Sequence, residues 1–192
     1  FAFADTVATA SESNRCHGWI GVRFQREPQG PVNEIVLHVR LLDRFRLQQQ
    51  EALGILGVNL IHGAFYQADD GATFIAPLQD NLGGKRIEID MIRFSGQELN
   101  HIDNRLMSLE LVKQGLAEAI LFGPKAEMLQ PSDALFKKPV LVQRGAFRPV
   151  TNVNVEILEK GLEQIKKDLD GKTPALMFEV TMKDWNSNEA DS

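Results

Sequence analysis

The sequence predicts an α/β fold: a mixed, mostly parallel sheet with flanking helices and an N-terminal β-hairpin. Three observations support this prediction. Residues 34–42 alternate between apolar and polar side chains, residues 19–24 form a second strand-like run shortly before them, and from residue 86 onwards strand-like and helical runs alternate. Strands that alternate with helices require crossover connections, which join parallel strands.

The first half of the chain holds the predicted hairpin and a long apolar helix. The connector between the two strands contains two prolines and a glycine, so it is a loop. Residues 45–66 have a helical pattern and are almost wholly apolar after Glu51, which is typical of a helix buried on all sides. A buried Asn59 and His62 within this helix must be hydrogen-bonded. A weaker helical pattern covers residues 74–82.

The second half alternates more regularly. Asp103 or Asn104 is placed to cap a helix, and Gly171 is placed to end another. The predicted helices cover 102–116, 131–136 and 153–171, and we expect the strands near 87–94, 118–123, 140–144 and 175–182 to run parallel.

For domain organisation, we expect an extended N-terminal segment over 1–15, a single α/β domain over 16–185 and a polar tail over 186–192. The first residues lack an initiator Met, and the tail is polar and acidic. Both ends suggest that this chain is part of a longer protein.

Composition narrows the function classes. The net charge of −5 argues against a nucleic-acid partner, which would need clustered Lys and Arg. The sequence lacks an apolar run of the roughly 18 residues needed to span a bilayer, so we expect no membrane partner. The single cysteine, Cys16, offers no disulfide or metal framework, and a reducing cytoplasm is the expected location.

The stretch RGAFRPVTNVNVEIL, residues 144–158, lies between a predicted strand and a predicted helix. Gly145 lets the backbone turn tightly, and Thr151 or Asn152 can cap the helix. In open parallel sheets, ligands bind beyond the carboxyl ends of the strands, where helix N termini favour anions. The pattern therefore predicts either a phosphate-binding turn or a plain strand-to-helix turn.

The same stretch resembles the signature of nicotinamide or nicotinate mononucleotide adenylyltransferases, G-x-F-x-P-x-(T/H)-x-x-H. Gly145, Phe147, Pro149 and Thr151 match it, and Asn154 stands where the family has its final His. In that family the His contacts the nucleotide phosphates and stabilises charge during adenylyl transfer. Asn can donate a hydrogen bond but cannot become cationic.

The chain departs from the pattern of this adenylyltransferase family in two further ways. The family's motif follows the first strand of the domain, whereas here it begins only at Gly145, and the family's later I-S-x-x-x-R phosphate motif is absent. The chain as a whole, notably CHGWIGVRFQ, EALGILGVNLIHGAFY and DNRLMSLELV, is similar to longer bacterial proteins labelled nucleotide adenylyltransferase or TonB-dependent receptor. The resemblance implies a nucleotidyltransferase-like protein and leaves enzymatic activity and cofactor open.

Two functions follow as hypotheses. The first is a nucleotide- or phosphate-binding protein, whose site residues would be Gly145, Phe147, Arg148, Thr151, Asn154 and, from the 101–105 junction, Arg105. Guanidinium groups suit this role because they pair well with phosphate. The second is a non-catalytic assembly domain, in which the apolar helix and the hairpin edge bind another copy or the rest of a longer chain.

Other polar residues give weaker indications of a functional site than the turn within residues 144–158. Cys16 and His17 are neighbours in sequence, so on a strand their side chains point to opposite faces, and nothing near them completes a zinc set. His38 falls on the polar side of its strand. Glu88 and Asp90 share a face and could bind a divalent cation, but adjacent Lys85 and Arg86 favour an ordinary charged surface. We therefore predict no metal site.

Overall fold

The computed structural model describes residues 1–7 and 16–182, and the chain forms two compact units: unit 1, Phe1–Gln130, and unit 2, Pro131–Ser192. The single domain over 16–185 stays a prediction. The polar tail expected over 186–192, and residues 8–15 of the expected N-terminal segment, lie outside the described residues.

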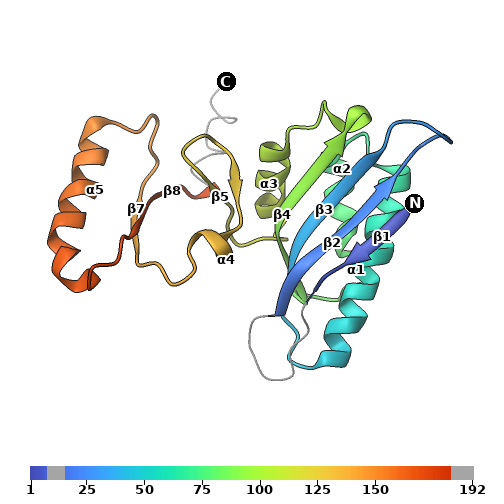
Figure 1. Cartoon of the computed structure of the whole chain (residues 1–192), viewed down its shortest axis with the longest axis horizontal. Coiled ribbons are helices and arrows are strands. Elements are labelled where there is room, and N and C mark those ends of the chain that lie inside the picture. Colours follow the sequence, from blue (N-terminus) through green and yellow to red (C-terminus); the bar gives the residue numbers. More distant parts are fainter. Residues whose placement is uncertain (8–15, 183–192) are drawn as a thin grey trace. The chain divides into compact units, whose positions relative to one another are not determined.

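Unit 1 is built on a four-stranded antiparallel sheet in the order β1-β2-β3-β4 (Figure 1). Its strands are β1 (Ala2–Asp5), β2 (Cys16–Phe24), β3 (Asn33–Leu41) and β4 (Ile87–Gly96). Strands β2 and β3 form the predicted hairpin, with Ile20 opposite Leu37. The strand predicted at 87–94 is also present, as β4, but it pairs antiparallel with β3.

The mostly parallel sheet was therefore a wrong prediction, and the number of helical segments between β3 and β4 explains why. Helix α1 (Arg46–Tyr66) is about 32 Å long, which matches the roughly 33 Å of a ten-residue strand. Helix α2 (Gly71–Ile75) and the 3-10 turn η1 (Ala76–Gln79) then lead the chain back. Strand β4 consequently starts beside the end of β3, with Ile87 opposite Leu41.

The strand predicted at 118–123 is also different in the structure. Only β5 (Leu121–Phe122) forms, and it pairs antiparallel with β6 (Met128–Leu129) instead of joining the main sheet. Before it, the 3-10 turn η2 (Gln97–Leu99) and α3 (Asn104–Lys113) follow β4. Asp103 caps α3 as expected, because its carboxylate accepts the Arg105 N–H at 2.9 Å.

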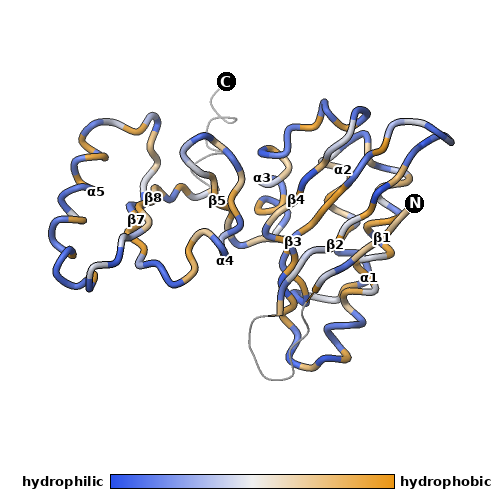
Figure 2. The backbone as a smooth tube through the Cα atoms, in the orientation of Figure 1, coloured by the Kyte–Doolittle hydropathy of each residue, from blue (hydrophilic) through white to orange (hydrophobic). Residues whose placement is uncertain are grey.

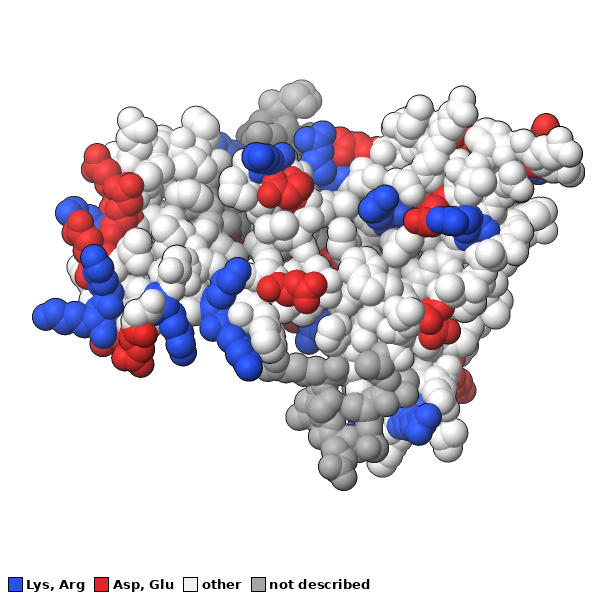
Figure 3. All heavy atoms as spheres, viewed as in Figure 1, with Lys and Arg blue, Asp and Glu red and all other residues white. Residues whose placement is uncertain are grey.

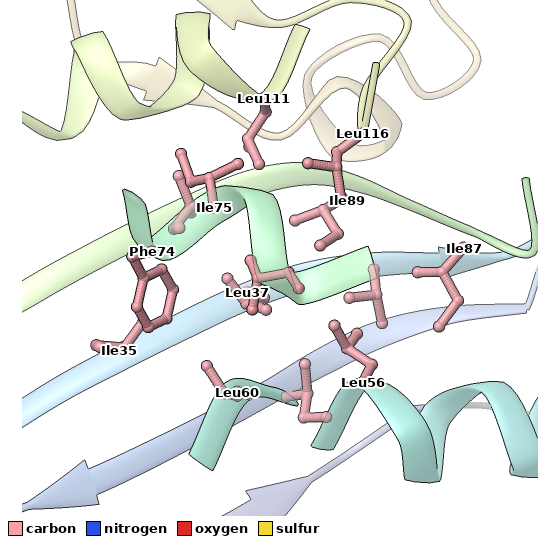
Figure 4. Packing of buried hydrophobic residues seen from close by; sticks show 14 of the residues in the cluster. Ile35, Leu37, Leu56, Leu60, Phe74, Ile75, Ile87, Ile89, Leu111 and Leu116 are labelled. Atoms are coloured by element: carbon pink, nitrogen blue, oxygen red, sulfur yellow. The ribbon is translucent and has the colours of Figure 1, made fainter. Parts of the chain in front are cut away.

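The core of unit 1 lies between the sheet and its helices. In Figure 4, apolar side chains from β3, α1, α2 and β4 point toward one another. Gly63 in α1 makes room for Phe74, since a Cβ at this glycine would lie 2.8 Å from the phenyl ring. Figure 2 shows apolar residues along both β2 and β3, and the burial pattern of β2 alternates so that one face of this strand lies in the core.

Helix α1 is buried on one side only, which corrects the prediction of a helix buried all round. Leu56 and Leu60 are fully buried, whereas Val58 is 67% exposed and Phe65 is 66% exposed. The physical reason is that β2, β3 and η1 pack against a single face of the helix. Asn59 is hydrogen-bonded as expected, donating to the carbonyls of Leu78 and Asp80 at 3.1 and 2.8 Å.

Unit 2 contains the only parallel pairing among the described strands. Strands β7 (Val140–Arg144) and β8 (Ala175–Glu179) pair in parallel and are joined through α5 (Asn152–Ile165) and the 3-10 turn η3 (Lys166–Leu169). The short helix α4 (Pro131–Ala134) precedes them. The strand predicted at 140–144 is confirmed with the same bounds, and the helices predicted at 131–136 and 153–171 and the strand predicted at 175–182 are present but end earlier.

Candidate functional site

The predicted phosphate-binding turn lies at the carboxyl end of β7. The strand ends at Arg144, the turn follows, and α5 begins at Asn152. Because β8 runs parallel to β7, the turn lies at the edge of the pair where ligands bind in open α/β sheets.

Gly145 and Phe147 build the inside of this turn. The Gly145 N–H donates to the Glu179 carbonyl at 3.0 Å, which continues the pairing with β8. A Cβ at Gly145 would lie 2.8 Å from the Phe147 ring, so a side chain has no room there. Phe147 adopts a φ of 36° and packs edge-to-face on Phe178 at 4.9 Å between ring centroids. Both residues therefore shape the turn from within.

Thr151 and Asn154 form the start of α5. The backbone N–H and the hydroxyl of Thr151 both donate to Asn154 Oδ1 at 2.8 Å. The Asn154 N–H in turn donates to the Thr151 carbonyl at 3.0 Å. The first helical residues, Asn152 and Val153, keep N–H groups without an intrahelical acceptor, as at any helix N terminus. Asn154 is thus a capping residue, and the helix presents two backbone donors.

The two arginines predicted to help, Arg148 and Arg105, and their neighbour Arg144 lie in different surroundings. Arg148 belongs to the turn, immediately before Pro149. Arg144 forms an ion pair with Glu179 at 2.7 Å. Arg105 is on α3 of unit 1, where two of its nitrogens contact the Asp103 carboxylate at 3.0 and 2.7 Å. The hydrogen bond from Arg105 holds the pKa of Asp103 at about 2.

Sequence reasoning missed a polar cluster on the outer face of the unit 1 sheet. His38 is fully buried, and its Nδ1 lies 2.5 Å from Oδ1 of Asp90. Its Nε2 lies 3.1 Å from Nδ1 of His17 and 2.7 Å from Nε2 of Gln130. The Trp19 ring packs on His38 with centroids 4.9 Å apart. Strand alternation and the hairpin register could have placed His17 and His38 on one face.

Charge is mixed on the face of the molecule seen in Figure 3. Figure 3 shows Lys and Arg interspersed with Asp and Glu on the face in view, with no single basic patch there.

Over residues 1–7 and 16–182, no three or more His, Cys, Asp or Glu side chains are grouped to hold a metal ion. No helix in the described part of the chain combines the length and apolar character needed to cross a bilayer.

Comparison of the chain with family models, with curated proteins and with solved structures yielded no match.

Proposed function

We propose that unit 2 binds the phosphate of a nucleotide at the turn between β7 and α5. The N–H groups of Asn152 and Val153 would meet the phosphate oxygens, and Arg148 would add positive charge. A cytoplasmic location is part of the proposal. Binding is proposed without adenylyl transfer, because Asn154 is neutral and is occupied in capping the helix.

The observation that carries the proposal is the place of the turn within unit 2. Strand β7 is the first strand of this unit, so the turn 145–151 follows a first strand, as the signature does in the adenylyltransferases. The strand-turn-helix-strand order and the parallel pairing further support it, because mononucleotide sites are built in this way. The contribution of Arg105 stays a prediction.

Arg148→Ala should weaken nucleotide binding about tenfold or more, as expected for a lost charge-assisted hydrogen bond. Titration calorimetry of the chain with ATP, a nicotinamide mononucleotide and inorganic phosphate measures this change. Lys167→Ala is the matched control, because it removes the same charge from an exposed position in η3, at the other end of the α5–η3 segment. The absence of heat with all three ligands at millimolar concentration would contradict the proposal.

The substitution Asn154→Asp is an independent test of phosphate binding at this turn. The carboxylate still accepts from Thr151 and suits the positive end of the helix, so the unfolding temperature should not fall. The added negative charge should nevertheless repel phosphate and weaken binding. A variant that binds as tightly as the original chain would place the ligand elsewhere.

A second function, assembly, is favoured by an aromatic patch at the C-terminal end of α1. Phe1, Phe65 and Tyr66 are 59%, 66% and 70% exposed. The Phe1 and Phe65 ring centroids are 5.8 Å apart, and those of Phe65 and Tyr66 are 4.9 Å apart. Contiguous exposed rings of this kind mark interaction surfaces. The proposed occupant is a second copy of the chain, which presents the same patch.

Phe65→Glu should convert this assembly to monomer in sedimentation velocity experiments at tens of micromolar, since a carboxylate cannot be buried unpaired in an apolar contact. Gln48→Glu is the control, because it adds the same charge to an exposed position in the first turn of α1. A monomer before any substitution would rule out assembly through a second copy.

A further inference from the structure

The cluster around His38 brings three nitrogen-bearing side chains from distant parts of unit 1 to one point. His17 comes from β2, His38 from β3 and Gln130 from the segment after β6. Both partners approach the same atom, Nε2 of His38, at 3.1 and 2.7 Å. The partners are 21 and 92 residues away from His38 in sequence.

The hydrogen bonding at this atom is crowded. Asp90 lies 2.5 Å from His38 Nδ1, and a carboxylate in that position holds the proton on Nδ1. In the neutral form of the ring with this tautomer, one lone pair is left, on Nε2. His17 Nδ1 and the Gln130 amide would both have to donate to that single lone pair. A fully buried nitrogen with two competing donors is an inefficient hydrogen-bond arrangement.

A metal ion resolves the crowding. Ligands 2.0–2.1 Å from a tetrahedral zinc lie about 3.3 Å from one another, so the His17 spacing at His38 needs to widen by about 0.2 Å and the Gln130 spacing by about 0.6 Å. A rotation of the Gln130 amide would present its oxygen instead of its nitrogen. The Asp90–His38 contact matches the carboxylate that normally orients a metal-binding histidine through its other ring nitrogen.

We propose that His17 Nδ1, His38 Nε2 and the Gln130 carboxamide oxygen bind a divalent transition-metal ion of the zinc type, with Asp90 as the orienting carboxylate. Two histidines and an oxygen suit Zn²⁺, Co²⁺ or Ni²⁺ better than Mg²⁺ or Ca²⁺. The proposed site is compatible with the absence of a group of three His, Cys, Asp or Glu ligands among the described residues, because its third ligand is an amide.

Two neighbouring side chains that could also act as metal ligands, Cys16 and Glu88, do not compete for the ion. Cys16 is next to His17 in sequence but is buried on the opposite face of the sheet, where the Gln49 amide lies 3.4 Å from its sulfur. Glu88, on the same strand as Asp90, is paired with Arg40 at 2.6 Å. The Trp19 ring closes one side of His38.

The test is equilibrium dialysis of the whole chain against Zn²⁺, together with the visible absorption of Co²⁺, which reports its coordination. The expected result is one ion per chain and a tetrahedral Co²⁺ spectrum. His17→Phe should abolish both, and Asp90→Asn should lower the affinity 10- to 100-fold, as for other orienting partners of metal ligands. His101→Phe is the matched control, because its histidine is exposed and contacts Asp69 instead.

Gln130→Glu tests whether Gln130 supplies the third ligand, once the original chain has been shown to bind Zn²⁺. As a metal ligand, a carboxylate is stronger than an amide, so the variant should bind Zn²⁺ at least tenfold more tightly than the original chain. Zn²⁺ binding by the variant alone would mean that the substitution created the site, and would overturn the proposal. Binding that persists in His17→Phe, or no binding by the original chain, overturns the proposal.

Discussion

Leu56→Asp should leave unit 1 unfolded, with the protein recovered in the insoluble fraction or showing no cooperative transition. Leu56 is fully buried on the inner side of α1, among the apolar side chains shown in Figure 4. Truncation of a buried leucine to Ala already costs about 2–5 kcal/mol, and an unpaired buried carboxylate costs several more. The total approaches the whole stability of a typical domain.

Val58→Asp is the control for this result. It lies two residues away on the same helix, but its side chain is 67% exposed. Circular dichroism and urea unfolding should show native helix content and a change in unfolding free energy of about 0.5 kcal/mol or less, as for ordinary surface substitutions. Equal damage from both substitutions would mean that α1 is buried on both sides.

Asp90→Ala should lower the unfolding free energy of unit 1 by about 1–3 kcal/mol even without added metal. The substitution leaves the Nδ1–H of the fully buried His38 without its acceptor, and an unsatisfied buried donor carries this cost. Asp90→Asn keeps an oxygen at the same place and should restore most of the loss.

Urea unfolding followed by Trp19 fluorescence measures the Asp90 effect, because Trp19 packs on His38. The chain has two tryptophans, so a Trp185→Phe background leaves Trp19 as the single reporter. Glu88→Ala is the control on the same strand, since its pair with the half-exposed Arg40 is worth only about 0–1 kcal/mol. An Asp90→Ala variant as stable as the original chain would show that the His38 cluster does not hold the sheet together.

The local elements were predictable because each depends on neighbouring residues. Alternation from Ile35 to Leu41 specified β3, and the Pro- and Gly-containing connector specified the hairpin. Asp103 capped its helix as the residue type suggests, and the order β7-α5-β8 followed from a strand, a turn and an amphipathic helix. The position of the candidate turn at 145–151 could also be predicted from the sequence.

Pairing direction and burial were decided by the tertiary structure. Periodicity in 86–94 identified a strand but carried no information on its neighbour, and the return path through α2 and η1 made it antiparallel to β3. The apolar character of α1 on all sides suggested full burial, yet only one side meets the sheet, so Val58 and Phe65 remain exposed.

The same division applies to the two sites. The sequence by itself determined the turn, because its residues are consecutive, although the capping role of Asn154 and the filling of the turn by Phe147 appeared only in the folded chain. The His38 cluster was decided by tertiary structure alone. Its members are 21, 52 and 92 residues away from His38, and only strand register and the path of the chain after β6 bring such distant polar groups into contact.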